Sequence, residues 1–214
     1  MPRRPCSRYE DVLIGDGGIN ILAGLAGNDF LRGVGASDTL VGGDGNDKLA
    51  VTNAPAPVDG EDGQDRLLLL GPDTFTFTDA SFKSIETIYV RGALTLDLSG
   101  VTAGTTVNLQ NAKDTFATVS GTKGNDIIRA GEGDTVIDGG TGNDKLYAGG
   151  GADTFTFKMN FGMDNVYGFA KGFDHFDVSA LVSSFEDINL TMLNGGVRTL
   201  LSRSMMLVLA AVSS

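Results

Sequence analysis

Aspartate, asparagine and glycine recur along this sequence at a spacing of nine residues. Stepping back in nines from "GGDGNDKLA" at Gly42 gives "GVGASDTLV" at Gly33, "GLAGNDFLR" at Gly24 and "GDGGINILA" at Gly15, and "GEDGQDRLL" follows at Gly60. The sixth position of these units reads Asp11, Asn20, Asp29, Asp38, Asp47, Ala56 and Asp65. Repeated carboxylates among glycine-rich backbone are oxygen ligands, so the pattern predicts the binding of hard cations.

A second block of the same units lies further along the chain. It reads "GTKGNDIIR" at Gly121, "AGEGDTVI" at Ala130, "GGTGNDKLY" at Gly139 and "AGGGADTFT" at Ala148, with aspartates at Asp126, Asp134, Asp144 and Asp153. The unit at Ala130 is one residue short, and Asp138 restores the phase before Gly139. We expect Asp126 to pair with Asp144 and Asp134 to pair with Asp153.

Each unit predicts a tight turn followed by a short strand. Glycine adopts the positive φ angles of such a turn at least cost, and the leucine at the eighth position would point inward. Two units make one coil of 18 residues, and stacked coils pair their strands in parallel about 4.8 Å apart. Asp11, Asp29, Asp47 and Asp65 would therefore line one edge, whereas Asn20, Asp38 and Ala56 would line the other.

Carboxylates stacked at this spacing repel one another by roughly 3.5 kcal/mol per pair at an effective dielectric constant of 20. A divalent cation between successive coils reverses the sign, and an all-oxygen shell without histidine or cysteine selects calcium. The predicted ligands are carboxylates of successive turns and backbone carbonyls of the glycine turns. They comprise Asp11, Asp29, Asp38, Asp47, Asp65, Asp126, Asp134, Asp144 and Asp153, with Gly24, Ala26, Gly27, Gly42, Gly43, Asp44, Gly45, Gly60, Asp62, Gly63, Gly139, Gly140, Thr141 and Gly142.

These units resemble the nonapeptides of the repeats-in-toxin (RTX) family, also called hemolysin-type calcium-binding repeats. The resemblance implies a calcium-bound parallel β-roll and export by a type I secretion apparatus. The segment "MDNVYGFAKGFDHFDVSAL" (163–181) looks like the stretch that follows the last repeats in such proteins, although that stretch commonly has an acidic residue where Gly168 stands. The expected fold is all-β: a right-handed parallel β-roll or β-solenoid with calcium-binding turns and a C-terminal cap.

Four segments are expected along the chain. The first RTX block spans 1–70, a solenoid insert without calcium spans 71–120, and the second RTX block spans 121–158. The insert alternates in strand fashion, as in "TFTFT" and "LTLDL", and a separate antiparallel sheet is its alternative reading. Residues 159–214 are expected to form the cap, with phenylalanines 155, 157, 161, 169, 173 and 176 closing the core. The tail "LSRSMMLVLAAVSS" is either an export signal or a final cap strand.

The composition and the motifs of the sequence argue against several classes of function. The net charge of −11 argues against nucleic acid and anionic membrane as partners. Cys6 is the single cysteine, so no internal disulfide forms, and the longest apolar run is too short to span a bilayer. No H-E-x-x-H, G-x-S-x-G or Walker motif is present, so we expect no enzyme activity.

The sequence thus predicts a secreted, calcium-binding RTX module that folds on calcium outside the cell. Two alternatives remain open. One is an adhesin-like module that binds an extracellular polysaccharide or a cell surface. The other is the non-catalytic C-terminal part of a larger secreted enzyme.

Overall fold

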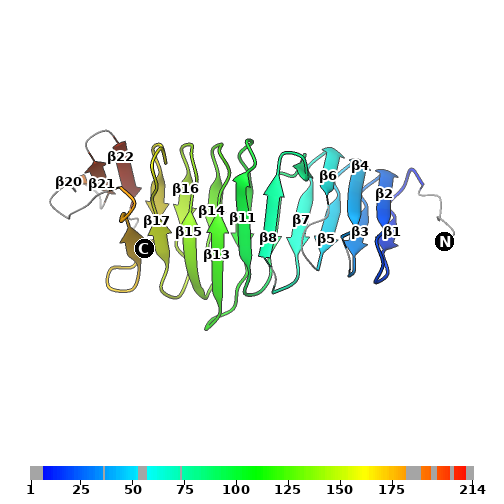
Figure 1. Cartoon of the computed structure of the whole chain (residues 1–214), viewed down its shortest axis with the longest axis horizontal. Coiled ribbons are helices and arrows are strands. Elements are labelled where there is room, and N and C mark those ends of the chain that lie inside the picture. The colour runs from blue at the N-terminus through cyan, green and yellow to red at the C-terminus, as the bar shows by residue number, and fades with distance from the viewer. Residues whose placement is uncertain are drawn as a thin grey trace.

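The chain forms an elongated parallel β-solenoid of about nine turns in a computed structural model. The structure describes residues 7–35, 37–52, 57–72, 74–181, 189–193, 197–202 and 205–210, and side chains up to residue 181. Strands stack as rungs along the long axis, so that the early and late rungs lie at opposite ends (Figure 1). The described part contains strands and turns but no helix, which confirms the predicted all-β class.

One face of the solenoid is a sheet of twelve strands, nine of which are single rungs in parallel succession. These nine are β1 (Val12–Ile14), β3 (Phe30–Gly33), β5 (Lys48–Val51), β7 (Arg66–Leu69), β10 (Thr87–Val90), β12 (Thr106–Leu109), β14 (Ile127–Arg129), β16 (Lys145–Tyr147) and β18 (Asn165–Tyr167).

The opposite face consists of two shorter parallel sheets placed end to end along the chain. The first contains β2 (Ile21–Ala26), β4 (Thr39–Asp44), β6 (Val58–Asp62) and β9 (Phe82–Lys83). The second contains β8 (Thr74–Thr78), β11 (Thr95–Gly100), β13 (Phe116–Ser120), β15 (Asp134–Asp138), β17 (Thr154–Thr156) and β19 (His175–Asp177).

The eighth residue of each unit forms the core, as the leucine pattern predicts. Leu31 pairs with Leu49 and Leu49 with Leu67, each 18 residues further on, and all three are fully buried. Leu40 fills the equivalent place on the opposite face. A solenoid core of this kind is built by repetition, because each rung buries its neighbour's apolar side chain.

The insert continues the same solenoid. Its rungs pair in parallel, as Leu67 with Ile88 and Ile88 with Val107 show, so the alternative of a separate antiparallel sheet is wrong. In β8 the threonines face outward, while Phe75 and Phe77 are fully buried.

The solenoid also continues past residue 158, where the sequence pattern placed the start of the cap. Strands β18 and β19 add one more rung to each face, through the pairs Leu146–Val166 and Phe155–Phe176. The predicted boundary at 158/159 is therefore wrong, because β18 and β19 keep the strand register although the nonapeptide spacing is lost.

Phenylalanines close this end of the core, as expected, with one exception. Phe155, Phe157 and Phe161 are buried, and the rings of Phe169 and Phe176 stack 4.3 Å apart against them. The exception is Phe173, which is 66% exposed and takes no part in the closure.

Beyond them the chain ends in a short antiparallel meander of β20 (Asn189–Leu193), β21 (Val197–Ser202) and β22 (Met205–Ala210). Strand β22 pairs in parallel with β18 and antiparallel with β21, so this part of the tail is a cap strand that joins the meander to the twelve-stranded sheet, and β20 forms the sheet edge.

Candidate metal centre

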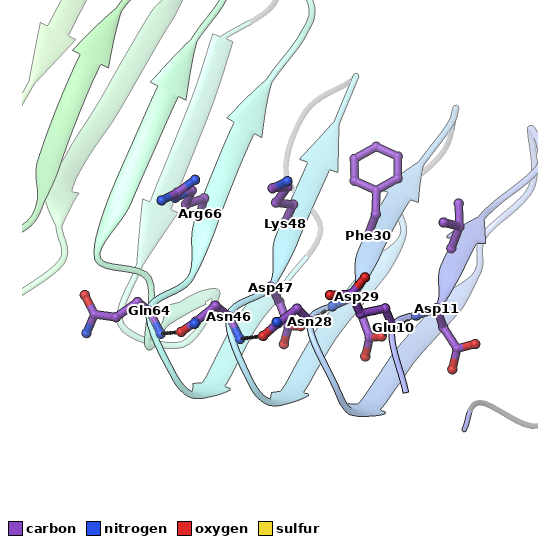
Figure 2. A pocket seen from close by; sticks show the side chains of 11 residues that line it. Glu10, Asp11, Asn28, Asp29, Phe30, Asn46, Asp47, Lys48, Gln64 and Arg66 are labelled. Atoms are coloured by element: carbon purple, nitrogen blue, oxygen red, sulfur yellow. Dashed lines mark hydrogen bonds between the residues drawn. The ribbon is translucent and has the colours of Figure 1, made fainter. Parts of the chain in front are cut away.

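The predicted aspartates stack in register along one edge of the solenoid and are joined by hydrogen bonds. The backbone N–H groups of Asp11, Asp29 and Asp47 donate to Oδ1 of Asp29, Asp47 and Asp65 respectively, each at 2.7 Å. Figure 2 shows Asp11, Asp29 and Asp47 on successive rungs of this edge. The 18-residue register predicted from the sequence is therefore correct in the first block.

The stacked aspartates form a ladder of hydrogen bonds, and a second ladder, which the sequence pattern did not predict, runs beside it. The N–H of Asn46 donates to Oδ1 of Asn28, and the N–H of Gln64 donates to Oδ1 of Asn46, each at 2.8 Å (Figure 2). Asn125 and Asn143 repeat the arrangement in the second block. The signal was present in the recurring "GND" triplet, whose asparagine occupies the fifth position of the unit.

The turns before these aspartates share one backbone conformation. The second and fourth residues of the unit have positive φ, as in Gly43 (113°) and Gly45 (135°). Leu25 (82°) and Glu61 (63°) adopt the same conformation at the second position despite their side chains. Such strain is sustained only where the surrounding structure or a ligand fixes the turn.

Most aspartates at the sixth position of the units, on both edges of the solenoid, and Asp164 after the last unit have one carboxylate oxygen that is buried without a hydrogen-bond partner. These atoms are Oδ2 of Asp29, Asp38, Asp47, Asp65, Asp144 and Asp164, and Oδ1 of Asp153. Asp126 differs, because the N–H and hydroxyl of Thr122 both donate to it. A buried acceptor without a donor is costly, so each orphaned oxygen marks a place where a cation would be stabilised.

The orphaned oxygens face the backbone of the first glycine of the unit. A Cβ atom on Gly42 would collide with Oδ2 of Asp47 and the carbonyl oxygen of Gly60 in the next coil. The same pair of acceptors meets at Gly24, formed by Asp29 and the carbonyl of Gly42. A carboxylate oxygen without a donor beside a backbone carbonyl forms a cradle that suits a hard cation such as calcium.

Carboxylates alone do not complete such a site. Within the described residues, no three histidine, cysteine, aspartate or glutamate side chains converge closely enough to hold a metal. Two carboxylates and several turn carbonyls per ion are the donor set that remains, and this set fits calcium better than zinc or copper.

Burial raises the pKa of several aspartates of the repeats in the absence of metal. It raises the pKa of Asp65 and of Asp126 to about 6, and the pKa of Asp29 and Asp47 rises for the same reason. The pKa of Asp144 rises most, to about 8, because burial is reinforced by the charges of Asp164 and Asp126. Bringing these groups together therefore works against their ionisation until a cation balances the charge.

The other edge is poorer in carboxylates, as predicted for the first block. The N–H of Asn20 donates to Oδ1 of Asp38 at 2.8 Å, and Ala56 lies outside the described residues.

In the second block the pairing of Asp134 with Asp153 is wrong by one residue. Asp134 is exposed and accepts the N–H of Ala152, whereas buried Thr135 lies opposite Asp153, one position before the registered pair Val136–Thr154. The short unit at Ala130 causes this shift. The expected pair of Asp126 and Asp144 does form, since the N–H of Asp126 donates to Oδ1 of Asp144 at 2.8 Å.

The ladder extends to residues that the repeat pattern did not assign to it. The N–H of Asp144 donates to Oδ1 of Asp164 at 2.9 Å, and the N–H of Asp153 donates to Oδ1 of Asp174 at 3.0 Å. In the insert, Oε2 of Glu86 accepts the N–H of Asp65. The turn before Asp164 has positive φ at Asn160 (68°) and Gly162 (88°), as the RTX turns have at their second and fourth positions.

Comparison with known families agrees with this geometry. Residues 68–198 match the model of the peptidase M10 serralysin C-terminal region, and residues 10–49 match four copies of the RTX calcium-binding nonapeptide repeat. The chain belongs to the serralysin C-terminal family. It is an RTX protein with calcium-binding repeats in a β-roll, which confirms the resemblance read from the sequence.

The serralysin C-terminal match covers the insert, the second repeat block and most of the C-terminal region. Both matched families are non-catalytic repeat regions. No curated protein matches the chain. The described residues contain no helix long and apolar enough to cross a membrane.

Proposed function

We propose that this chain is a secreted calcium-binding RTX module whose folding depends on calcium outside the cell. The observation that carries the proposal is repeated from coil to coil: a buried carboxylate Oδ2 without a hydrogen-bond donor lies beside a backbone carbonyl oxygen of the next coil. A cation at each pair would remove both the unsatisfied acceptor and the repulsion between stacked carboxylates.

The ions would lie between successive coils on the edge of Asp11, Asp29, Asp47 and Asp65, with three sites in the first block. In the second block Asp144 and Asp164 would hold ions in the same way, through Oδ2 atoms that have no donor, whereas both oxygens of Asp126 already accept hydrogen bonds. The first four residues of the turns would add backbone carbonyls, from Gly24, Ala26 and Gly27 and their equivalents in later coils. Asp38 and Asp153 would contribute on the other edge.

The same dependence of folding on calcium is compatible with export of an unfolded chain. Extracellular modules bind calcium at roughly 10⁻⁴–10⁻³ M, far above the concentrations met by cytosolic buffers and sensors. The chain would stay loose inside the cell, pass through a type I secretion apparatus, and fold on release. The match to the serralysin C-terminal region supports this route and supports the reading as a non-catalytic part of a larger secreted enzyme.

A calcium titration of the full chain tests the proposal. At tenfold excess over Kd each site adds about 1.4 kcal/mol, so five sites would add about 7 kcal/mol, comparable with the stability of a whole domain. We expect a disordered circular dichroism spectrum in chelator and a β-type spectrum in millimolar calcium, with magnesium as the control. Identical spectra in chelator and in calcium would refute the proposal.

A further inference from the structure

The first coil of the solenoid carries an unusual number of apolar side chains on its outside. In the part of the chain whose side chains are described, six of the ten exposed large hydrophobic residues lie between positions 9 and 25. We call this set the apolar collar, and its members are Tyr9, Val12, Ile14, Ile19, Ile21 and Leu25. Exposed apolar side chains that gather in one region mark an interaction site.

The next coil has polar residues at two positions of the collar. Ile14 pairs in register with Arg32, and Ile21 pairs in register with Thr39. Coils of this solenoid therefore stack with polar residues at these outward positions. The packing of one coil on the next does not require the apolar residues of the collar, so their presence in the first coil needs another explanation.

The collar surrounds the open edges of two strands. β1 and β2 are the first strands of their sheets, and among the described strands each has one pairing neighbour, β3 and β4 respectively (Figure 1). Neither strand contains a charged residue or a proline, which are common means of preventing an edge strand from pairing with another chain. The inward Leu13 and Leu22 are only partly buried, whereas Leu31 and Leu40 of the next coil are fully buried. This end therefore exposes both apolar core and unpaired backbone.

The opposite end of the solenoid is closed. Strands β22, β21 and β20 extend the twelve-stranded sheet beyond β18 (Figure 1). The other sheet ends at β19, where His175 and Asp177 flank Phe176. A charged residue on an edge strand opposes pairing with another chain. Stacking of one copy's first coil on another copy's last coil is therefore disfavoured, and an end-on contact between copies would join two first coils.

We propose that the first coil binds the first coil of a second copy of this chain, so that two solenoids form a closed dimer. The contact would continue the coil-to-coil interface that builds the fold, with the two cores joined end to end. Such a twofold contact uses the same surface on both copies. With β1 antiparallel to its equivalent and Leu13 opposite Leu13, Val12 would lie beside Ile14 of the second copy. Cross-strand contacts of this kind stabilise antiparallel pairs.

Charge makes the expected dimer depend on calcium and on salt. Each chain has a net charge of −11, so two copies repel one another. Salt at about 0.15 M limits this repulsion to a range of about 8 Å, and bound calcium would lower the negative charge itself. An apolar contact between uncharged strands should therefore strengthen as salt is added. This inference rests on the proposed calcium-dependent fold.

The test is sedimentation of the full chain in millimolar calcium over a range of protein concentrations. The variant carries Ile14→Arg and Ile21→Thr, which place in the first coil the residue types that the second coil has at Arg32 and Thr39. Its matched control is Phe116→Arg, which replaces an exposed apolar residue in β13, away from both ends. Ile21→Thr alone is a second, milder variant. Circular dichroism of dilute protein gives the calcium midpoint of folding for each chain.

We expect the parent and Phe116→Arg to sediment at twice the monomer mass, and the double variant to dimerise at least about tenfold more weakly. The calcium midpoint of dilute protein should be the same in all chains. It should fall with rising protein concentration in the parent and not in the double variant, because dimerisation stabilises the folded state by mass action.

Three results would overturn the inference: a monomeric parent, a dimer that the collar substitutions do not weaken, or equal weakening by Phe116→Arg. A monomeric parent would indicate that another protein or another segment covers the collar. If the double variant does not fold with calcium, Ile21→Thr must weaken the dimer for the inference to stand. A chain that folds with calcium but stays monomeric refutes this inference alone, whereas a chain that ignores calcium refutes the proposed function.

Discussion

The backbone N–H of Asp29 donates a 2.7 Å hydrogen bond to Oδ1 of Asp47, while Oδ2 of Asp47 is buried and unpartnered. The two oxygens of one carboxylate therefore have different tasks. Oδ1 accepts the hydrogen bond that fixes the register between coils, and Oδ2 is free to bind a ligand. Replacing such a residue removes a coil-to-coil hydrogen bond together with any ion that Oδ2 holds.

Replacement of Asp47 by alanine should therefore cost more than replacement of Asp38. Asp47 lies between Asp29 and Asp65 and would serve two ions, whereas Asp38 serves one at most. At tenfold excess of calcium over Kd, we expect losses of about 2.8 kcal/mol and at most about 1.4 kcal/mol respectively from bound calcium. Calorimetric titration and calcium-dependent unfolding measure both, and equal losses would show that the 18-residue register does not govern binding.

Filling the cradle should weaken calcium binding without removing a carboxylate. In Gly42→Ala the new methyl group would collide with Oδ2 of Asp47 and with the carbonyl of Gly60. Such overpacking typically costs about 1–3 kcal/mol, and here we expect it as a raised calcium midpoint. Gly17→Ala is the control, since nothing lies within 4 Å of its Cβ position. Equal midpoints for both variants would contradict a site at this cradle.

The 18-residue register could be predicted from the sequence because each nine-residue unit contains all the residues that determine it. Each unit carries its own turn glycines, ladder aspartate and inward leucine, so spacing alone places Asp29 beside Asp47 and Leu31 beside Leu49. Stacking then copies the arrangement from coil to coil.

The 18-residue spacing did not predict the ladder residues where a turn changes its length while the strands keep their register. Asp164 follows Asp144 by 20 residues and Glu86 follows Asp65 by 21, so neither falls on the 18-residue pattern. The turn before Asp164 also has Asn160 at the second position, where units such as those at Gly42 and Gly139 have glycine, and asparagine tolerates positive φ better than most residues. Conversely, Asp134 fits the pattern by residue type, but the shortened unit places Thr135 opposite Asp153 instead.

Asp164 should therefore behave as a ladder residue although the sequence pattern passes over it. It is buried, its Oδ1 bonds to Asp144, and its Oδ2 has no partner. We expect Asp164→Asn to lower the calcium stoichiometry and raise the calcium midpoint. Asp177→Asn is the control, because that carboxylate lies outside the ladder and accepts the N–H of Ser179. Unchanged stoichiometry in Asp164→Asn would place the last ion before this turn.

The calcium-free chain should become less stable as the pH rises from about 4 to about 8. Burial raises the pKa of Asp153 to about 6, of Asp164 to about 7 and of Asp144 to about 8, so the folded state binds protons that the unfolded state has released. Stability from these groups is full below the unfolded pKa, near 4, and is lost through the folded values.

Calcium should reverse this trend, because protons compete for the same oxygens. Circular dichroism in chelator should show more β structure at pH 4.5 than at pH 8, and the calcium midpoint should rise as the pH falls. Asp144→Asn should flatten both dependences. A calcium-free chain equally disordered across this range, with a midpoint independent of pH, would show that these carboxyls do not control folding.

The aromatic end of the solenoid should be required for folding of the last coils. A chain ending at Lys158 lacks β18 and β19, and leaves Leu146, Phe155 and Phe157 at an open end of the core. Exposed strand edges and apolar side chains at a solenoid end favour association. We expect a higher calcium midpoint and larger oligomers than the parent forms in sedimentation. A chain ending at Leu181 keeps the stacked rings of Phe169 and Phe176 and should fold near the parent midpoint. If the shorter chain forms no larger species than the parent and has an unchanged midpoint, the phenylalanine cluster is not what closes the core.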